Sequence, residues 1–214
     1  MLASRSWRNV VNDMKVTDGN YYISFLRHNT HGDDLKASAD VSKGFFQAHV
    51  KTSLSASADF SRGEQYSGGN IQDYKYRSLS LCPEVLYSPS FMEVNYSGTF
   101  RWHHSDVGNN SANNLFDWTQ RLSLTSTISN VDLTWSGAFY HNEIVSSPSV
   151  NTFFMDASAV WRLKVMRIRA ILRNILNKRE YAVTTYSGVG VFTNSYELRP
   201  RELLISVQFS LGSW

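Results

Sequence analysis

The sequence predicts an all-β protein, an antiparallel up-and-down meander of about ten long strands. Apolar and polar residues alternate with a period of two along most of the 214 residues, as they do in strands that have one apolar face. Tyr, Phe, Ser and Thr are abundant, which favours strands and turns. No uninterrupted apolar run reaches the roughly 18 residues that a transmembrane helix needs.

The segment from Phe46 to Phe60 shows this alternation most clearly. Its even positions are mostly apolar or small, and its odd positions are polar. Strands of soluble domains have about five or six residues, whereas a strand that crosses a membrane needs about 9–11. Aromatic residues at both ends of the apolar face are typical of lipid-facing strands, where they lie at the membrane interfaces. We therefore predict a transmembrane strand here.

The same pattern recurs along the rest of the chain, and the connections between the predicted strands alternate in length. Ser129-Asn130 is a tight turn, whereas the loops predicted on either side are longer and polar. These long loops are residues 61–73, 105–114, 141–151 and 174–196. Outer-membrane barrels have short periplasmic turns and long extracellular loops, so the alternation predicts a barrel of this kind. The N-terminal third is less regular: residues 1–20 are an irregular or incomplete start, and residues 24–41 are predicted as a strand pair around a polar loop.

Two sets of side chains follow from these predicted faces. Aromatic residues are expected at the membrane interfaces: Phe46, Phe60, Trp102, Phe116, Trp118, Trp135, Phe139, Phe153 and Trp161. Charged residues are expected on the lumenal face: Lys51, Arg101, Asp117, Arg121, Asp132, Asp156, Arg167, Arg169 and Arg173. We interpret the charged set as a cross-strand ladder rather than a catalytic group.

Other classes of site have little support in the sequence. The net charge is +3 with dispersed Lys and Arg, which argues against a nucleic-acid partner. Cys82 is the single cysteine, so no intrachain disulfide can form. His103 and His104 with His141, and separately His28 with His31, are candidate metal ligands that we interpret as exposed loop histidines. Asp33-Asp34 and the loop at residues 108–110 are candidate Ca²⁺ ligands, but they supply far too few ligands for a recognisable site. Since no phosphate-binding or hydrolase motif occurs either, we predict neither an enzyme nor a cofactor.

About the last 45 residues carry a more specific pattern. A first group consists of Asn174, Ile175, Leu176, Asn177, Lys178 and Tyr181, and a second of Arg199, Pro200, Arg201 and Glu202. A final alternating strand then leads to Phe209, with Trp214 out of phase. This pattern resembles the C-terminal β-barrel portion of Bacteroides-type TonB-dependent outer-membrane receptors.

The resemblance implies a place for this chain in a larger assembly. Receptors of that family are 22-stranded barrels that contain an N-terminal plug. The chain would be one C-terminal barrel segment, open when isolated and not competent for transport alone, in the outer membrane of a Gram-negative bacterium. Its implied partners are outer-membrane lipid, the rest of the receptor and, through it, TonB. The N-terminus lacks the regions of a signal peptide, so we expect a mature form or a fragment.

Two alternatives remain open at this point. The chain can be a small autonomous outer-membrane barrel with a structural or adhesive role, because about ten strands suffice for one. It can also be a soluble carbohydrate-binding β-sandwich, in which the apolar face is a core and the aromatic side chains gather on one platform.

Overall fold

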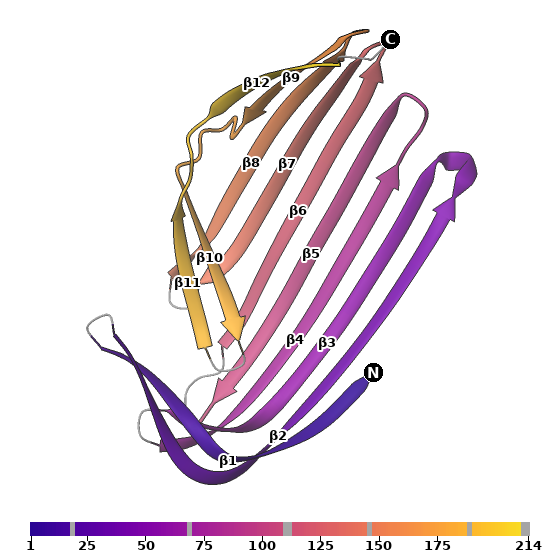
Figure 1. Cartoon of the computed structure of the whole chain (residues 1–214). Coiled ribbons are helices and arrows are strands. Elements are labelled where there is room, and N and C mark those ends of the chain that lie inside the picture. Colours follow the sequence, from indigo (N-terminus) through magenta and orange to yellow (C-terminus); the bar gives the residue numbers. More distant parts are fainter. Residues whose placement is uncertain (18–19, 68–69, 109–112, 145–146, 188–189, 211–214) are drawn as a thin grey trace.

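The computed structural model describes residues 1–17, 20–67, 70–108, 113–144, 147–187 and 190–210. Its strands are β1 (Leu2–Thr17), β2 (Asn20–Phe45), β3 (Val50–Ser67), β4 (Asn70–Tyr87), β5 (Met92–Val107), β6 (Asn113–Ile128), β7 (Val131–Ile144), β8 (Ser147–Arg162), β9 (Met166–Arg173), β10 (Glu180–Ser187), β11 (Gly190–Glu197) and β12 (Glu202–Phe209). Ten of them form one antiparallel sheet in the order β1 to β9 and then β12, while β10 and β11 pair with each other (Figure 1). The predicted all-β meander is confirmed.

The sheet is open. Strands β1 and β12 form its two edges and do not pair with each other, and Figure 1 shows the sheet as a curved, unclosed wall. A compact protein of 24.4 kDa exposes about 10,000 Å², whereas this chain exposes 14,987 Å². Leu115 is the one apolar side chain that is buried among those the structure describes. The predicted open sheet is therefore confirmed.

Strand register gives the sheet an apolar face and a polar face. Leu81, Phe100 and Trp118 lie opposite one another on β4, β5 and β6, and share the apolar face. Arg101 and Asp117, each next in sequence to one of these rings, lie opposite one another on the polar face. From β3 to β12 the two faces stay in phase along the ladders up to Asn142 of β7, because each ladder keeps a constant register there and places residues of one face opposite residues of the same face.

The apolar face forms a band of limited height. On β3 the band contains Val50, Thr52, Leu54, Ala56, Ala58 and Phe60, and the next residue on this face is Arg62. From Val50 to Phe60 the strand rises about 33 Å, at about 3.3 Å per residue. A tilt of about 40° reduces this to about 25 Å, the height of the lipid-facing band of outer-membrane barrels. Beyond the band, β3 to β8 continue as polar extensions, which are the described parts of residues 61–76, 103–115 and 140–152.

The structure corrects the predicted start of the most regular strand. Phe46 belongs to a short 3-10 turn, Phe46–Ala48, and β3 begins only at Val50. His49 adopts the left-handed conformation (φ 53°), and its N–H donates to the carbonyl oxygen of Phe46 at 3.1 Å. The side chain of Phe46 is 90% exposed in this turn. Alternation alone did not separate the turn from the strand because the turn residues happened to continue the pattern.

The predicted long loops are also corrected. Most of residues 61–73, 105–114 and 141–151 belong to paired strands, and 174–196 contains the β10–β11 hairpin. Residues 24–41 lie within the single strand β2 rather than in a strand pair, and residues 2–17 pair with β2 as β1. The hydrogen bonds of a ladder join backbone groups, so strand pairing continues where the side chains on both faces are polar. Such segments show no alternation of apolar and polar residues, and the sequence therefore did not predict them as strands.

The described turn between β6 and β7 is as short as predicted, with Ile128 opposite Val131 and Ser129 at φ 54°. No helix among the described residues is long and apolar enough to span a membrane.

Candidate functional site

Four polar side chains form a continuous cluster on the polar face, which we call the polar-face cluster: Tyr76, Arg101, His103 and Asp117. Arg101 Nη2 lies 2.8 Å from Asp117 Oδ2, and His103 Nε2 lies 3.3 Å from Asp117 Oδ1. The other ring nitrogen of His103, Nδ1, lies 2.9 Å from the hydroxyl oxygen of Tyr76. The side chain of Asp117 is only 8% exposed. One carboxylate on β6 thus contacts both a guanidinium and an imidazole on β5, and Tyr76 extends the cluster to β4.

The histidines that the sequence offered as candidate metal ligands lie on different strands and faces and have different partners. His103 is wrongly predicted as an exposed loop residue, because its side chain is 12% exposed within β5. His104 points to the opposite face, where its Nδ1 lies 2.7 Å from Asn114 Oδ1 and its ring stacks on Trp102. His141 contacts Asn151 and Trp118, and His28 contacts Glu64. Among the described residues, no group of three or more His, Cys, Asp or Glu is arranged to hold a metal ion.

The predicted charged ladder is realised at some positions and not at others. Arg101 and Asp117 contact each other, whereas Asp132 pairs with Arg162, a residue that the predicted set omits. Arg162 could have been predicted as a member of this set, because its even position on β8 places it on the same face as Asp156. Of the other members, Lys51 lies opposite Leu86, Arg167 opposite Gln208 and Arg169 opposite Ser206, and Arg173 pairs with Glu202 at 3.4 Å. Arg121 contacts Tyr140, and Asp156 contacts the backbone of Asn174.

A second polar-face group is aromatic and joins strands that are far apart in sequence. The rings of Tyr140 and Phe154 lie 5.7 Å apart, and Tyr181 of β10 lies 5.4 Å from the first and 5.6 Å from the second. All three contacts are edge-to-face, the geometry that aromatic pairs prefer. The guanidinium of Arg121 lies 5.5 Å from the Tyr140 ring and donates to its hydroxyl oxygen at 3.3 Å. We call these four residues the aromatic latch.

Asn174 and Asn177 form a polar clamp at the base of the β10–β11 hairpin. The side-chain amide of Asn174 donates to the carbonyl oxygens of Lys178 and Arg199, both at 2.8 Å. Its side-chain oxygen accepts the Lys178 N–H, also at 2.8 Å. Asn177 accepts the Arg201 N–H at 3.0 Å. The segments before and after the hairpin are therefore tied to each other by two side chains, which we call the Asn clamp.

The backbone conformation at the Asn clamp explains why asparagine suits both positions. Asn174 and Asn177 have φ of 49° and 53°, in the left-handed region that asparagine tolerates better than most residues. The N–H of Asn174 donates to Asp156 Oδ1 at 2.7 Å, and the N–H of Ile175 donates to the Met155 carbonyl oxygen at 2.8 Å. These bonds fasten the clamp to β8.

The other motif residues flank this clamp. Glu202 opens β12 opposite Arg173, and Phe209 closes it opposite Met166. Pro200 lies between the hairpin and β12. Trp214 lies outside the described residues.

The predicted interfacial aromatic residues other than Phe46 share the apolar face through the register of their strands. Trp102 lies opposite Phe116, and Phe139 lies opposite Phe153. Trp118 lies 5.0 Å from the ring of Phe139. Phe60 is the last residue of the band on β3. Trp161 lies at the opposite end of the band, near the tight turn between β6 and β7, and Trp135 lies between the two ends.

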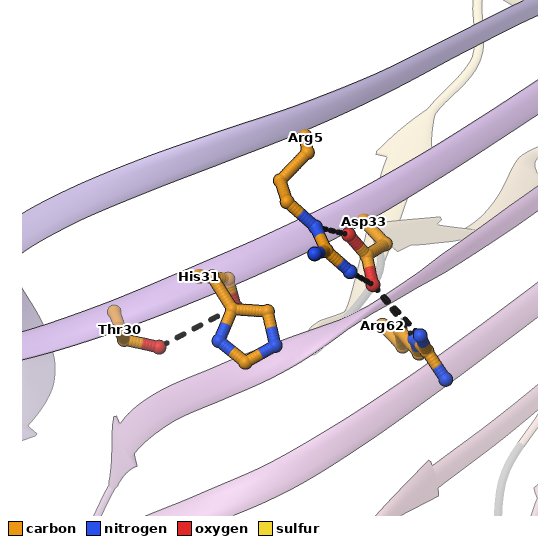
Figure 2. Close-up of polar contacts among 5 residues, drawn as sticks. All are labelled: Arg5, Thr30, His31, Asp33 and Arg62. Carbon is orange, nitrogen blue, oxygen red and sulfur yellow. Dashed lines mark hydrogen bonds and ion pairs between the residues drawn. The ribbon is translucent and has the colours of Figure 1, made fainter.

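A charged triad lies just beyond the band on the same face. Figure 2 shows Arg5 and Arg62 converging on Asp33 from the two neighbouring strands. Arg5 Nε and Nη2 donate to the carboxylate at 2.5 and 2.9 Å, and Arg62 Nε donates at 3.0 Å. Hydrogen bonds from Arg5 and then Arg62 hold the pKa of Asp33 well below its usual range. Thr30 and His31, also in Figure 2, make a separate contact in which the Thr30 hydroxyl donates to the His31 carbonyl oxygen at 3.5 Å.

Comparisons with protein-family models, with curated proteins and with solved structures found no match.

Proposed function

We propose that the chain is the C-terminal barrel segment of a TonB-dependent outer-membrane receptor that takes up nutrients. In this proposal the apolar face contacts outer-membrane lipid, the polar face lines the lumen, and the two edge strands join the remaining strands of a 22-stranded barrel. A plug from the same receptor would occupy the lumen, and the receptor would contact TonB. The segment alone would not transport.

The observation that carries the proposal is the exposed apolar band. A band about 25 Å high has the dimension of the lipid-facing surface of an outer-membrane barrel. Exposed apolar side chains occur along it on several strands, among them Leu54, Leu79, Leu133 and Ile205. A soluble sandwich would cover this face with a second sheet, and the one described hairpin outside the sheet packs on the opposite face.

The open edges support a segment rather than a complete barrel. In lipid, unpaired N–H and C=O groups cost several kcal/mol each, so a membrane sheet has to close. Strands β1 and β12 both have a row of such groups. The motif around Asn174 and Arg199 supports the choice of family through resemblance alone.

The small autonomous barrel remains the second candidate, because ten sheet strands are an even number within the range of bacterial outer-membrane barrels. Closure would require β1 to pair with β12.

Membrane fractionation tests the proposal. A tag is placed at the C-terminus of the chain in its native cell, and the outer membrane is separated by density and run on a gel without boiling. We expect the tag in the outer membrane, in a folded species larger than 24.4 kDa. A folded species of 24.4 kDa would favour the autonomous barrel, and recovery in the soluble fraction would contradict both.

A further inference from the structure

Four basic side chains of β1, β3 and β4 gather on the apolar face at the end of the band that Phe60 marks: Arg5, Arg62, Lys75 and Arg77. Arg62 lies directly opposite Lys75, and Arg77 follows Lys75 by two residues on the same face. Arg5 lies opposite Asp33, which in turn lies opposite Arg62 (Figure 2). Opposite side chains are about 5 Å apart at Cβ and diagonal ones about 7–8 Å. The four cations therefore form one patch, which we call the basic rim.

The basic rim presents positive charge to its surroundings, although two carboxylates lie among its members. The side chains of Arg5 and Arg62 are 52% and 55% exposed, whereas that of Asp33 between them is 19% exposed. Asp106 lies opposite Lys75 and is half-buried, while Lys75 is exposed. Like charges directly opposite each other, as in Arg62 and Lys75, destabilise a sheet. An anion bound over this pair would remove that repulsion.

The height of the basic rim matches the head-group layer of a bilayer. This layer adds about 5–8 Å to each side of the hydrocarbon core. Arg77 lies opposite Phe60, the last residue of the band, and Arg62 is two residues beyond Phe60, which is about 5 Å higher at a tilt of about 40°. Glu64 and Asp73 lie opposite each other at about 10 Å. On β3 and β4 the charge thus changes from positive to negative just outside the layer in which lipid phosphates lie.

Two cations of the basic rim lie over aromatic rings. The guanidinium of Arg77 lies 5.9 Å from the centre of the Phe60 ring, and that of Arg5 lies 6.0 Å from the centre of the Trp7 ring. The side chain of Trp7 is 74% exposed. Basic side chains at a membrane edge lie along apolar surface and direct their charged ends to the head groups, where exposed Trp is also enriched.

We propose that the basic rim binds the phosphate groups of a negatively charged lipid of the outer membrane. Arg62, Lys75 and Arg77 hold the phosphate, and the acyl chains of the same lipid lie along the band below Phe60. Arginine binds phosphate through paired N–H donors, and lysine acts as a point charge. The inference rests on the proposed function in placing the band in the outer membrane, and it applies equally to a wider barrel and to an autonomous one.

Lipid binding to the tagged protein, purified from its native membrane in a neutral detergent and freed of lipid, tests the proposal. The probes are phosphatidic acid, diacylglycerol with the same acyl chains, and inorganic phosphate at constant ionic strength. Native mass spectrometry measures the bound lipid. We expect phosphatidic acid to bind more tightly than diacylglycerol by more than about tenfold, and inorganic phosphate to leave this binding unchanged. Equal binding of the two lipids would overturn the proposal, and displacement by inorganic phosphate would overturn it in favour of a site for free anions.

Two matched double variants test the residues. Lys75→Gln with Arg77→Gln removes two cations from the apolar face of β4, and Arg167→Gln with Arg169→Gln removes two equally spaced cations from the polar face of β9. Each basic residue near a negatively charged lipid surface contributes about fivefold to binding. The β4 variant should therefore bind phosphatidic acid about thirtyfold more weakly, and the β9 variant should bind it as the unchanged protein does. Equal effects of the two variants, or no effect of the β4 variant, would overturn the proposal.

Separation of the same cells by membrane density reports the proposed function independently. A chain recovered outside the outer membrane would contradict the proposed function. A β4 variant that stays in the outer membrane and binds phosphatidic acid as tightly as the unchanged protein would contradict the lipid site alone.

Discussion

The two parts of strand β3 are paired in the same way but carry different side chains. From Val50 to Phe60 the apolar face holds Leu54, Ala56 and Ala58, whereas after Phe60 the same face holds Arg62 and Glu64. The ladder with β4 continues through both parts without a shift in register. The comparison teaches that backbone pairing builds this wall throughout, and that side-chain hydropathy marks only the part that faces an apolar environment.

The largest expected effect distinguishes the band from the extensions. Leu124→Arg places a charge on the apolar face within the band and should cost about 2–4 kcal/mol, whereas Ile71→Arg on the same face beyond the band should cost about 0–1. Urea unfolding in lipid vesicles of the larger barrel that we propose measures both. Thr125→Arg is the matched control on the polar face, beside Leu124, and should be tolerated. Equal costs for Leu124→Arg and Thr125→Arg would refute the assignment of faces.

The next effect concerns the Asn clamp, where the wall ends and the hairpin begins. Asn174→Ala loses three side-chain hydrogen bonds and strains a residue at φ 49°, so we expect a loss of about 2–3 kcal/mol. Asn174→Gly loses the same bonds without the strain and should be less damaging by about 1 kcal/mol. The same unfolding assay compares the two. If glycine were as damaging as alanine, backbone conformation would not be the reason for asparagine here.

A smaller effect is expected in the polar-face cluster. Arg101→Ala leaves the buried carboxylate of Asp117 without its guanidinium and should cost about 1–3 kcal/mol. Arg162→Ala removes the partner of Asp132, whose side chain is 15% exposed against 8% for Asp117, so less than about 1 kcal/mol is expected. Comparison of their unfolding midpoints provides the measurement. The reverse order would show that burial does not decide the strength of these pairs.

The smallest effect is a pH dependence beyond the band. The pKa of Asp33 is lower in the folded chain than in an unfolded one, so the triad stabilises the fold above the ordinary Asp pKa of about 3.9 and loses this contribution as the pH falls. Carboxyl titration by NMR should place the midpoint of Asp33 below that of an exposed aspartate. Asp33→Asn should remove this part of the acid sensitivity, and an ordinary midpoint would argue against the paired triad.

The sequence predicted the band well and the extensions poorly for the same reason. Between Met92 and Trp102 apolar residues alternate with polar ones because one face meets an apolar environment, so strand, phase and turns can be predicted. At 61–67 both faces are polar, so the backbone pairing of this segment with β4 produces no alternation in the sequence. The turn at Phe46 escaped prediction because its residues imitate the alternation.

The candidate sites were less predictable than the fold. The odd positions of Arg101 and Asp117 were enough to assign both to the polar face. That they lie directly opposite each other depends on the register between β5 and β6, which cannot be read from the sequence. The contact of Tyr181 with Tyr140 depends on the hairpin folding back over the polar face of the sheet, and no local sequence pattern predicts that arrangement. The two asparagines were recognised as a motif, while their role as a clamp emerged only from the hydrogen bonds.

The central claim is that this wall is one part of a wider barrel. Refolding of the 214-residue chain into detergent micelles, followed by electrophoresis with and without boiling, tests it most directly. Because β1 and β12 leave unpaired edges, we expect aggregation and no compact band that shifts on heating. A compact, heat-modifiable monomer would contradict the account, since it would show that the ten sheet strands close on themselves.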